Sequence, residues 1–331
     1  MKPLRPAAER LQTILKVCNN VNRERGIPDM PAITTKQFNL LTDVNLAWDF
    51  LVEVYDANRV EAPYFEYAIS EVWMSKDYLH LCRFWLDGEK VVGFVFHENP
   101  VTNLHFALRP GYEALAEDMV AYAAGMFPLS FGPAEFVFDP RQKALIAAAE
   151  KQGWMLAETE REYRLDMTNA SLDYELPQGY HFVAPDEIDA LKLARCTWSG
   201  FNEWELGPFK DWDKPDSSDW NPHKSFLDVQ SGMMAPPPHS TYEHNVVIAN
   251  EEGEYVCYSG MWWVPENGLA YMEPLCTALN YQHRGLASAA LTVHYRKFKA
   301  LGGKVLTGGG SDFYRKIGYD TEAVSLIYRK A

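Results

Sequence analysis

An internal repeat is the feature that most constrains how this chain folds. A Gly-Glu-x-Val turn occurs at residues 88–91 and again at residues 253–256, an offset of 165 positions. A Gly-aromatic pair that closes a short helical segment occurs at Gly153-Trp154 and again at Gly318-Tyr319, with the same offset. Two landmarks that keep one offset indicate a duplicated domain, and a duplication decides the architecture before any local pattern does.

The length of 331 residues agrees with two compact units, because domains average about 150 residues. We place their boundary between Ser171 and Leu172, in a polar stretch that precedes a turn-like Leu-Pro-Gln-Gly at residues 176–179. The predicted division is a helical extension at residues 1–36, with helical spacing within residues 7–21, followed by units at residues 37–171 and 172–331.

Charge and composition exclude several classes of function. A formal net charge of -14 and a pI near 5.1 repel nucleic acids and anionic membranes and attract cationic small molecules. The five cysteines are an odd number without a Cys-x-x-Cys pair, so we expect reduced thiols rather than disulfides or a zinc ribbon. No segment is typical of a signal peptide or a membrane span. We therefore expect a cytoplasmic protein with no nucleic-acid or membrane partner, and a homodimer is compatible with the sequence.

One segment of the second half has the pattern of an anion site. Residues 271–276 are strand-like, residues 278–284 form a short polar loop, and Gly285 opens an amphipathic helix that stops at Gly302-Gly303. Unpaired N–H groups and the helix dipole at such a helix start favour phosphate. A glycine at position 285 permits close approach of the backbone, and Arg284 is placed to contact a phosphate at the rim.

Other phosphate-binding motifs fit the sequence less well. The P-loop requires Gly-Lys-Ser/Thr, and no lysine stands at this place. A dinucleotide fingerprint requires G-x-G-x-x-G before its helix, whereas the cluster at residues 308–310 follows the helix.

Two motifs together resemble the GNAT superfamily of acyl-CoA-dependent N-acyltransferases. Residues 282–287, Gln-His-Arg-Gly-Leu-Ala, are similar to its Gln/Arg-x-x-Gly-x-Gly/Ala loop, and residues 313–319, Phe-Tyr-Arg-Lys-Ile-Gly-Tyr, are similar to its second signature. The resemblance implies an α/β (α+β) fold of two GNAT-like domains, each a mixed, mostly antiparallel sheet flanked by helices. It also implies acetyl-CoA as co-substrate. The expected cofactor-binding residues are Leu275, Cys276, Thr277, Gln282, His283, Arg284, Gly285, Leu286, Ala287 and Ser288.

The resemblance also implies the catalytic groups. Glu273 is the expected general base, which takes a proton from an ammonium directly or through water, and Tyr314 is the expected proton donor to the CoA thiolate. The alternatives are a strand carboxylate that pairs with a lysine and a packed aromatic side chain. Cys276 is better read as a small buried residue than as a nucleophile. Many family members carry an asparagine shortly before the Phe-Tyr pair, and residues 307–312 of this chain do not.

The first half is expected to be a copy without cofactor binding. The offset of 165 places its loop at residues 117–122, where Val120 stands in the place of Gly285. The carboxylates of Glu117 and Asp118 would repel a pyrophosphate. We expect this half to brace the other and to help form the wall of the acceptor site.

The acceptor site is expected in an aromatic and acidic stretch after Cys196. Trp198, Phe201 and Trp204 are the predicted substrate-binding residues, since aromatic faces near carboxylates suit an amine. The alternative is that these aromatics fill a core or an interdomain seam. Residues 207–238 are read as one long irregular connection. The histidines show no metal spacing, so we expect no metal.

Three functions agree with these patterns. The first is an N-acetyltransferase for a primary amine of a small molecule, by direct attack in a ternary complex. The second is a non-catalytic module that binds or senses acyl-CoA. The third is acyl transfer to a thiol or peptide acceptor.

Overall fold

The computed structural model describes residues 33–215, 219–234, 238–240 and 242–330. The helix expected within residues 7–21, and Cys18 with it, lie outside these residues. The first half comprises β1 (Ile33–Gln37), α2 (Val44–Asn58), α3 (Ala62–Ser70), η1 (Leu79–Leu81), β2 (Arg83–Asp87), β3 (Lys90–His97), β4 (Asn103–Leu108), η2 (Glu113–Leu115), α4 (Ala116–Ala124), η3 (Leu129–Phe131), β5 (Glu135–Phe138), α5 (Lys143–Lys151) and β6 (Trp154–Asp166).

The second half repeats this plan, with more helical segments between its first two strands. It comprises β7 (Tyr180–Val183), η4 (Pro185–Glu187), α6 (Ala190–Gly200), η5 (Glu203–Leu206), α7 (Pro222–Asp228), η6 (Val229–Met234), η7 (Tyr242–His244), β8 (Val246–Asn250), β9 (Tyr255–Val264), β10 (Leu269–Thr277), η8 (Leu279–Tyr281), α8 (Leu286–Ala300), β11 (Val305–Thr307), α9 (Asp312–Ile317) and β12 (Thr321–Lys330). The stretch at residues 207–238, expected to be irregular, therefore contains α7 and η6. Asn221 caps α7 by accepting a hydrogen bond from the N–H of Lys224.

The two halves have the same strand topology, as the repeat predicts. In the first, β2, β3 and β4 pair in antiparallel order and β4 runs parallel to β5. In the second, β8, β9 and β10 are antiparallel and β10 runs parallel to β11. The two Gly-Glu-x-Val turns close the equivalent hairpins β2–β3 and β8–β9. The Gly-aromatic pairs at residues 153 and 318 each lead from a short helix into a long strand.

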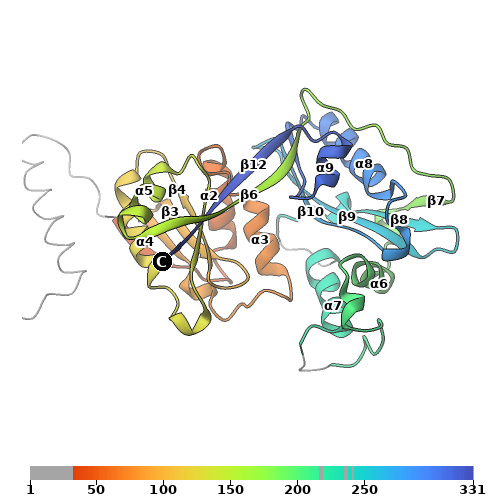
Figure 1. The fold of residues 1–331 in the computed structure, drawn as a ribbon, viewed down its shortest axis with the longest axis horizontal. Helices are drawn as coiled ribbons and strands as arrows, with labels where there is room; N and C mark the ends of the chain where they lie inside the picture. Colours follow the sequence, from red (N-terminus) through yellow and green to blue (C-terminus); the bar gives the residue numbers. More distant parts are fainter. Residues whose placement is uncertain (1–32, 216–218, 235–237, 241, 331) are drawn as a thin grey trace, which may run out of the picture.

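The halves exchange their last strands within one sheet. The strand order is β1-β2-β3-β4-β5-β12-β6-β11-β10-β9-β8-β7. The final strand of the second half, β12, pairs with β5 of the first, and β6 of the first half pairs with β11 of the second. Figure 1 shows β6 and β12 as a two-stranded ribbon that joins the two halves. Each half therefore needs a strand from the other to complete its sheet.

This exchange bears on the predicted boundary between the two units. A cut between residues 171 and 172 falls in the connection after β6, so it separates two segments of chain but not two self-contained sheets. Strand β1 begins at Ile33, so residues 33–36, expected in the extension, belong to the sheet because they pair with β2. Strand β2 begins at Arg83, and Leu79–Leu81 before it is a short helical turn.

Helices cover both faces of the sheet. In the second half α6 packs on one face of β9 and β10 and α8 packs on the other (Figure 1). Strands β3 and β9 are therefore buried along almost their whole length, as strands covered on both faces are. The largest core cluster belongs to the first half, but Trp262, Leu269 and Tyr271 of the second half pack into it. The two halves thus share a hydrophobic core as well as a sheet.

Candidate functional site

The loop between β10 and α8 presents backbone N–H groups at a helix start. Gly285 caps α8 with a φ of 83°, in the left-handed region, and His283 has a φ of 60°. Within the described residues, the N–H groups of residues 283–287 have no hydrogen-bond acceptor. These unpaired donors and the helix dipole favour an anion. The loop therefore fits the pyrophosphate of CoA that the sequence resemblance implies.

Side chains of the loop brace it from within. Arg284 donates hydrogen bonds to the Tyr180 hydroxyl at 3.1 Å and to the Asn280 carbonyl at 2.8 Å. Gln282 donates to the carbonyl of Thr277 at 3.3 Å. Leu286 and Ser288 are buried, and Ala287 is half-buried. Phosphate contacts would thus fall mainly to the backbone, and a contact from Arg284 stays a prediction.

Strands β10 and β11 separate soon after they meet. Their parallel pairing is limited to Leu269 with Val305 and Ala270 with Leu306. On its other edge β10 pairs with β9 through Leu275, Cys276 and Thr277. No strand pairs with the edge of residues 275–277 that faces β11 within the described residues, although the Thr277 carbonyl accepts from Gln282. An extended arm of a ligand fits such an edge, because it can pair with the free backbone groups.

A bulge in β10 shapes the strand next to this opening. The pairing of β10 with β9 shifts in register between Met272 and Leu275, on either side of Glu273. Opposite the bulge, a Cβ at Gly260 would lie 2.3 Å from the carbonyl oxygen of Glu273. Only glycine fits at this close approach, so Gly260 is required for the shape of the bulge.

Glu273 occupies an environment suited to a base that titrates near neutral pH. Burial, together with the negative charges of Glu162 and Glu98, raises the pKa of Glu273 to about 8. No lysine or arginine forms an ion pair with it among the described residues. The alternative of a strand carboxylate paired with a lysine therefore does not describe Glu273.

Tyr314 lies at the start of α9, beside the separated strands. It is 7% exposed, and its ring packs against Gly309 and against Tyr319, with a centroid distance of 5.2 Å. Burial and the charge of Glu273 raise the pKa of Tyr314 well above its usual value. Its phenol therefore keeps its proton at neutral pH, as a proton donor must. No hydrogen bond of its hydroxyl is formed within the described part of the chain.

A cavity of about 310 Å³ opens above Glu273 at the junction of the two halves. We call it the Glu273 cavity. Its lining residues are aromatic or acidic except for one proline: Tyr64, Tyr67, Trp73, Glu98, Phe201, Glu203, Trp220, Asp228, Tyr271, Glu273 and Pro274. Burial raises the pKa of Glu203 to about 7, and Trp220 donates a hydrogen bond to this carboxylate. Aromatic faces next to carboxylates recognise an ammonium group.

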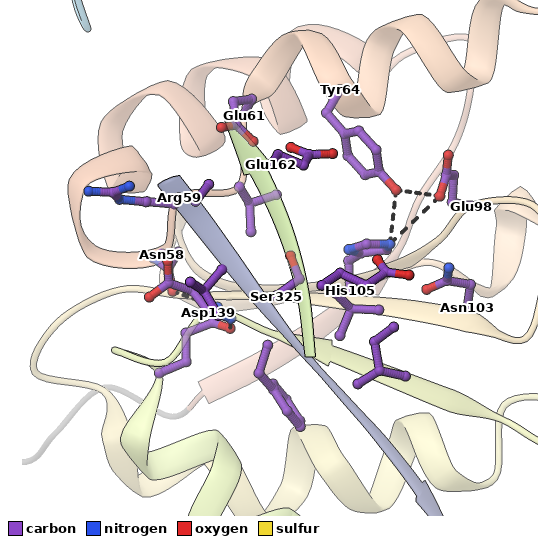
Figure 2. Close-up of a pocket in the computed structure, with 18 of the residues that line it drawn as sticks. Asn58, Arg59, Glu61, Tyr64, Glu98, Asn103, His105, Asp139, Glu162 and Ser325 are labelled. Atoms are coloured by element: carbon purple, nitrogen blue, oxygen red, sulfur yellow. Dashed lines mark hydrogen bonds and ion pairs between the residues drawn. The ribbon is translucent and has the colours of Figure 1, made fainter. Parts of the chain in front are cut away.

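A second cavity of about 380 Å³, the side cavity, adjoins the first. Four residues line both: Tyr64, Glu98, Tyr271 and Glu273. The side cavity extends from them across one face of β4, β5, β6 and β12, between α3 and the sheet (Figure 2). Further carboxylates of its wall are Glu61, Glu135, Asp139, Glu158, Glu160 and Glu162.

Three side chains of the first half form a hydrogen-bonded group where the cavities meet. Tyr64 donates to the carboxylate of Glu98, and its hydroxyl lies 3.0 Å from Nε2 of His105. Figure 2 shows the three pointing toward one another. Burial lowers the pKa of His105 to about 3, so the imidazole is neutral and leaves the charge of Glu98 uncompensated.

The predicted acceptor residues are only partly brought together. Phe201 lines the Glu273 cavity, 41% exposed. Trp198 is 3% exposed and packs against Phe209, and its indole N–H donates a hydrogen bond to the Gly207 carbonyl. Trp198 is therefore a core residue, which was the alternative interpretation. Trp204 lies on η5 and lines neither the Glu273 cavity nor the side cavity. Sequence reasoning did not identify the first-half side chains Tyr64, Tyr67, Trp73 and Glu98, because no local motif marks them.

The first-half counterpart of the cofactor loop is not where the offset places it. Residues 117–122 lie inside helix α4, and Val120 is buried in the core. The connection from β4 to α4 is instead residues 109–115, and the helix is capped by Leu115 rather than by a glycine. The offset fails here because the strand before the helix is shorter in the first half, with 6 residues in β4 and 9 in β10. Glu117 and Asp118 stand in the first turn of α4, where negative charge opposes a phosphate.

Three further features of the described residues bear on function. Cys82, Cys196, Cys257 and Cys276 are free and buried. No group of three or more His, Cys, Asp or Glu side chains with metal-binding geometry occurs in the described part of the chain. None of the described helices combines the length and apolar character needed to span a bilayer.

Comparisons with known proteins agree with this geometry. No protein-family model and no curated protein matches the sequence. Among solved structures, a GCN5-related N-acetyltransferase from Sphaerobacter thermophilus matches with a TM-score of 0.54 at 12% identity, over 90% of this chain and 95% of that one. A GNAT-family acetyltransferase from Colwellia psychrerythraea gives 0.56 at 9% identity, over 90% and 100%. A tandem GNAT protein from the clavulanic acid biosynthesis pathway gives 0.52 at 9% identity, over 90% and 98%.

The chain has the fold of the GNAT superfamily. The likeness includes both halves, since each of these matches covers 90% of the chain. Within this GNAT fold, residues 282–287 form the loop at the start of α8, and residues 313–319 form α9 and the turn into β12. Residues 307–312, where the sequence departs from the family pattern, begin with Thr307, whose hydroxyl accepts a hydrogen bond from the N–H of Met272 at 2.7 Å.

Proposed function

We propose that the protein is an N-acetyltransferase that transfers the acetyl group of acetyl-CoA to a primary amine of a small molecule. The observation that carries the proposal is the position of Glu273. Its carboxyl lies beside the opening between β10 and β11, at the base of an aromatic and acidic cavity, with a pKa of about 8. A group with these properties binds an ammonium and accepts its proton near neutral pH.

The cofactor-binding residues fit acetyl-CoA, which supplies the acyl thioester. The N–H groups of residues 283–287 would hold its pyrophosphate, and the open edge of residues 275–277 would pair with its pantetheine arm. Glu273 removes a proton from the ammonium, and the neutral amine forms a C–N bond as the C–S bond breaks. Tyr314 gives its proton to the departing thiolate, and the second proton that the amine nitrogen loses as the amide forms restores the phenol. No residue of the protein becomes acylated in this scheme.

Titration calorimetry with acetyl-CoA tests the cofactor site. We expect one site per chain, because only the second half has a glycine-capped loop, and we expect Gly285→Asp to abolish binding by adding negative charge and a side chain. Binding at two sites would show that the first half also holds CoA. No binding at all would overturn the proposal.

Release of the CoA thiol in the presence of an amine tests catalysis. If acetyl-CoA binds without turnover, and Glu273→Gln does not change this binding, the result would instead support a module that senses acyl-CoA. The mass of the product distinguishes an N-acetylated amine from transfer to a thiol or a peptide.

A further inference from the structure

The side cavity is not used by the reaction proposed above, although it adjoins Glu273. An amine with a single charge would be accommodated within the Glu273 cavity alone. The side cavity continues from this point for the width of four strands and has a volume of about 380 Å³, within the size range of small-molecule sites. Its chemistry therefore bears on what else the acceptor carries.

The charge of the side cavity is unbalanced at the end nearest Glu273. Arg164 forms an ion pair with Glu61, and Arg329 pairs with Glu135 and Glu158. Glu98, Glu160 and Glu162 form no ion pair with a lysine or arginine among the described residues. In Figure 2 the remaining cation of the wall, Arg59, lies across the cavity from Glu98. This end thus carries three carboxylates without an ion-pair partner, and the cation that acts on Glu162, Arg164, is already paired with Glu61.

Tyr271 provides an independent sign that a ligand binds here. Its side chain is 9% exposed and lines both cavities. No hydrogen bond of its hydroxyl is formed within the described residues, although buried tyrosine hydroxyls ordinarily have a partner. A donor group bound between Tyr271 and the carboxylates would complete this bond.

Repulsion among the carboxylates points in the same direction. Desolvation within the cavity wall and the charges of Glu61 and Glu98 raise the pKa of Glu162, while the positive charge of Arg164 lowers it. Burial also raises the pKa of Glu98. Glu162 is exposed to solvent, so solvent screens part of this repulsion. A bound cation would relieve this repulsion.

We propose that the side cavity binds a second ammonium group of the acceptor, so that the acceptor is a diamine or a polyamine. One amine lies at Glu273 and is acetylated. The next is held by Glu98 and Glu162, with Tyr271 as a hydrogen-bond acceptor. This inference rests on the proposed function for its chemistry, but the binding of a second cation can be measured without turnover.

Calorimetry of the full-length protein with spermidine and with butylamine tests the inference. We expect spermidine to bind at least about tenfold more tightly, since a charge-assisted contact contributes about 1.5–3 kcal/mol. Glu162→Gln should weaken spermidine about tenfold and change butylamine less than about twofold, and Glu98→Gln, at the junction of the two cavities, should weaken spermidine more than butylamine. The matched control is Glu322→Gln, which removes an exposed carboxylate of the β6–β12 ribbon that pairs with Arg161 outside the cavity.

The outcomes separate the two proposals. If spermidine binding depends on Glu98 and Glu162 while no amine releases CoA, the second cation site stands and the acyltransferase proposal fails. If spermidine and butylamine bind and react alike, and both cavity variants behave as Glu322→Gln does, the second cation site is refuted and the acyltransferase proposal stands. Thermal unfolding of each variant establishes that it is folded. The variants at Glu98 and Glu162 test the second cation site independently of each other.

Discussion

The hydroxyl of Thr307 accepts a hydrogen bond from the backbone N–H of Met272 at 2.7 Å, where β10 and β11 cease to pair. Both residues are buried. A side chain of β11 thus takes the place of the next bond of the ladder and holds the two strands at the start of the opening. Met272 directly precedes Glu273, so this contact also fixes the backbone that carries the proposed base.

Replacing Thr307 with valine should weaken both the fold and the cofactor site. The N–H of Met272 would be left buried without an acceptor, which costs about 1–3 kcal/mol. Thr307→Ser keeps the hydroxyl and should lose much less. Denaturant unfolding measures the first effect, and calorimetry with acetyl-CoA measures the second. Equal stability of the valine and serine variants would contradict this role.

A matched pair of glycines separates backbone strain from cofactor binding. Gly285 and Gly302 lie at the two ends of α8 and have φ values of 83° and 87°. A Cβ added at either position would have no neighbouring atom closer than 3.9 Å. Alanine at either position should cost about 1 kcal/mol of stability. Only Gly285→Ala should also weaken acetyl-CoA binding, because Gly302 lies at the other end of the helix. A similar loss of affinity in both variants would refute the anion loop.

The activity should rise with pH through the titration of Glu273. Below a pKa of about 8 the carboxyl is protonated and cannot act as a base, so kcat/KM should increase up to this pH and then level off. Glu273→Gln should lower kcat by about 10²-fold or more. Glu162→Gln removes a nearby negative charge and should move the inflection to lower pH. If the inflection does not move in this variant, the titration of Glu273 does not set the pH dependence of the activity.

Two neighbouring tyrosines distinguish proton donation from packing. Tyr314→Phe should lower kcat about 10²-fold with little change in acetyl-CoA affinity, because the phenolic proton is lost and the ring remains. Tyr319 packs against the same ring, and its hydroxyl donates to the Thr307 carbonyl at 3.4 Å. Tyr319→Phe should affect stability more than kcat. Steady-state kinetics of both variants, with thermal unfolding, provides the comparison.

Glu71 and Asp228 should make the protein less stable as pH rises. These buried carboxyls, one from each half, adjoin each other, and burial raises the pKa of both. The folded state therefore binds a proton that the unfolded state releases above its usual pKa near 4.5, so stability is greatest at low pH and falls as pH increases. Glu71→Gln should be more stable than the wild type at pH 8 by about 1 kcal/mol or more, and similar to it at pH 5. Thermal unfolding at both pH values tests this, and parallel pH profiles would contradict it.

Local sequence was sufficient for the elements whose residues lie close together in the chain. The glycine-capped loop before α8, the hairpins β2–β3 and β8–β9 and the position of Tyr314 on α9 were all predicted. The reason is that turns, caps and helix starts depend on backbone preferences within a few residues. The constant offset of the repeat failed at residues 117–122, because β4 is shorter than β10.

The exchange of β6 and β12 was decided by tertiary structure, because strands 150 or more residues apart pair according to the whole sheet and no short pattern records their register. For the same reason sequence analysis placed Trp198 and Trp204 near the acceptor, whereas the cavity takes Tyr64, Tyr67, Trp73 and Glu98 from the other half. The sequence by itself determined the fold of each half and the glycine-capped loop before α8. Packing of the two halves decided the Glu273 cavity, its charge and the pKa of Glu273, since burial and the proximity of distant carboxylates exist only in the folded chain.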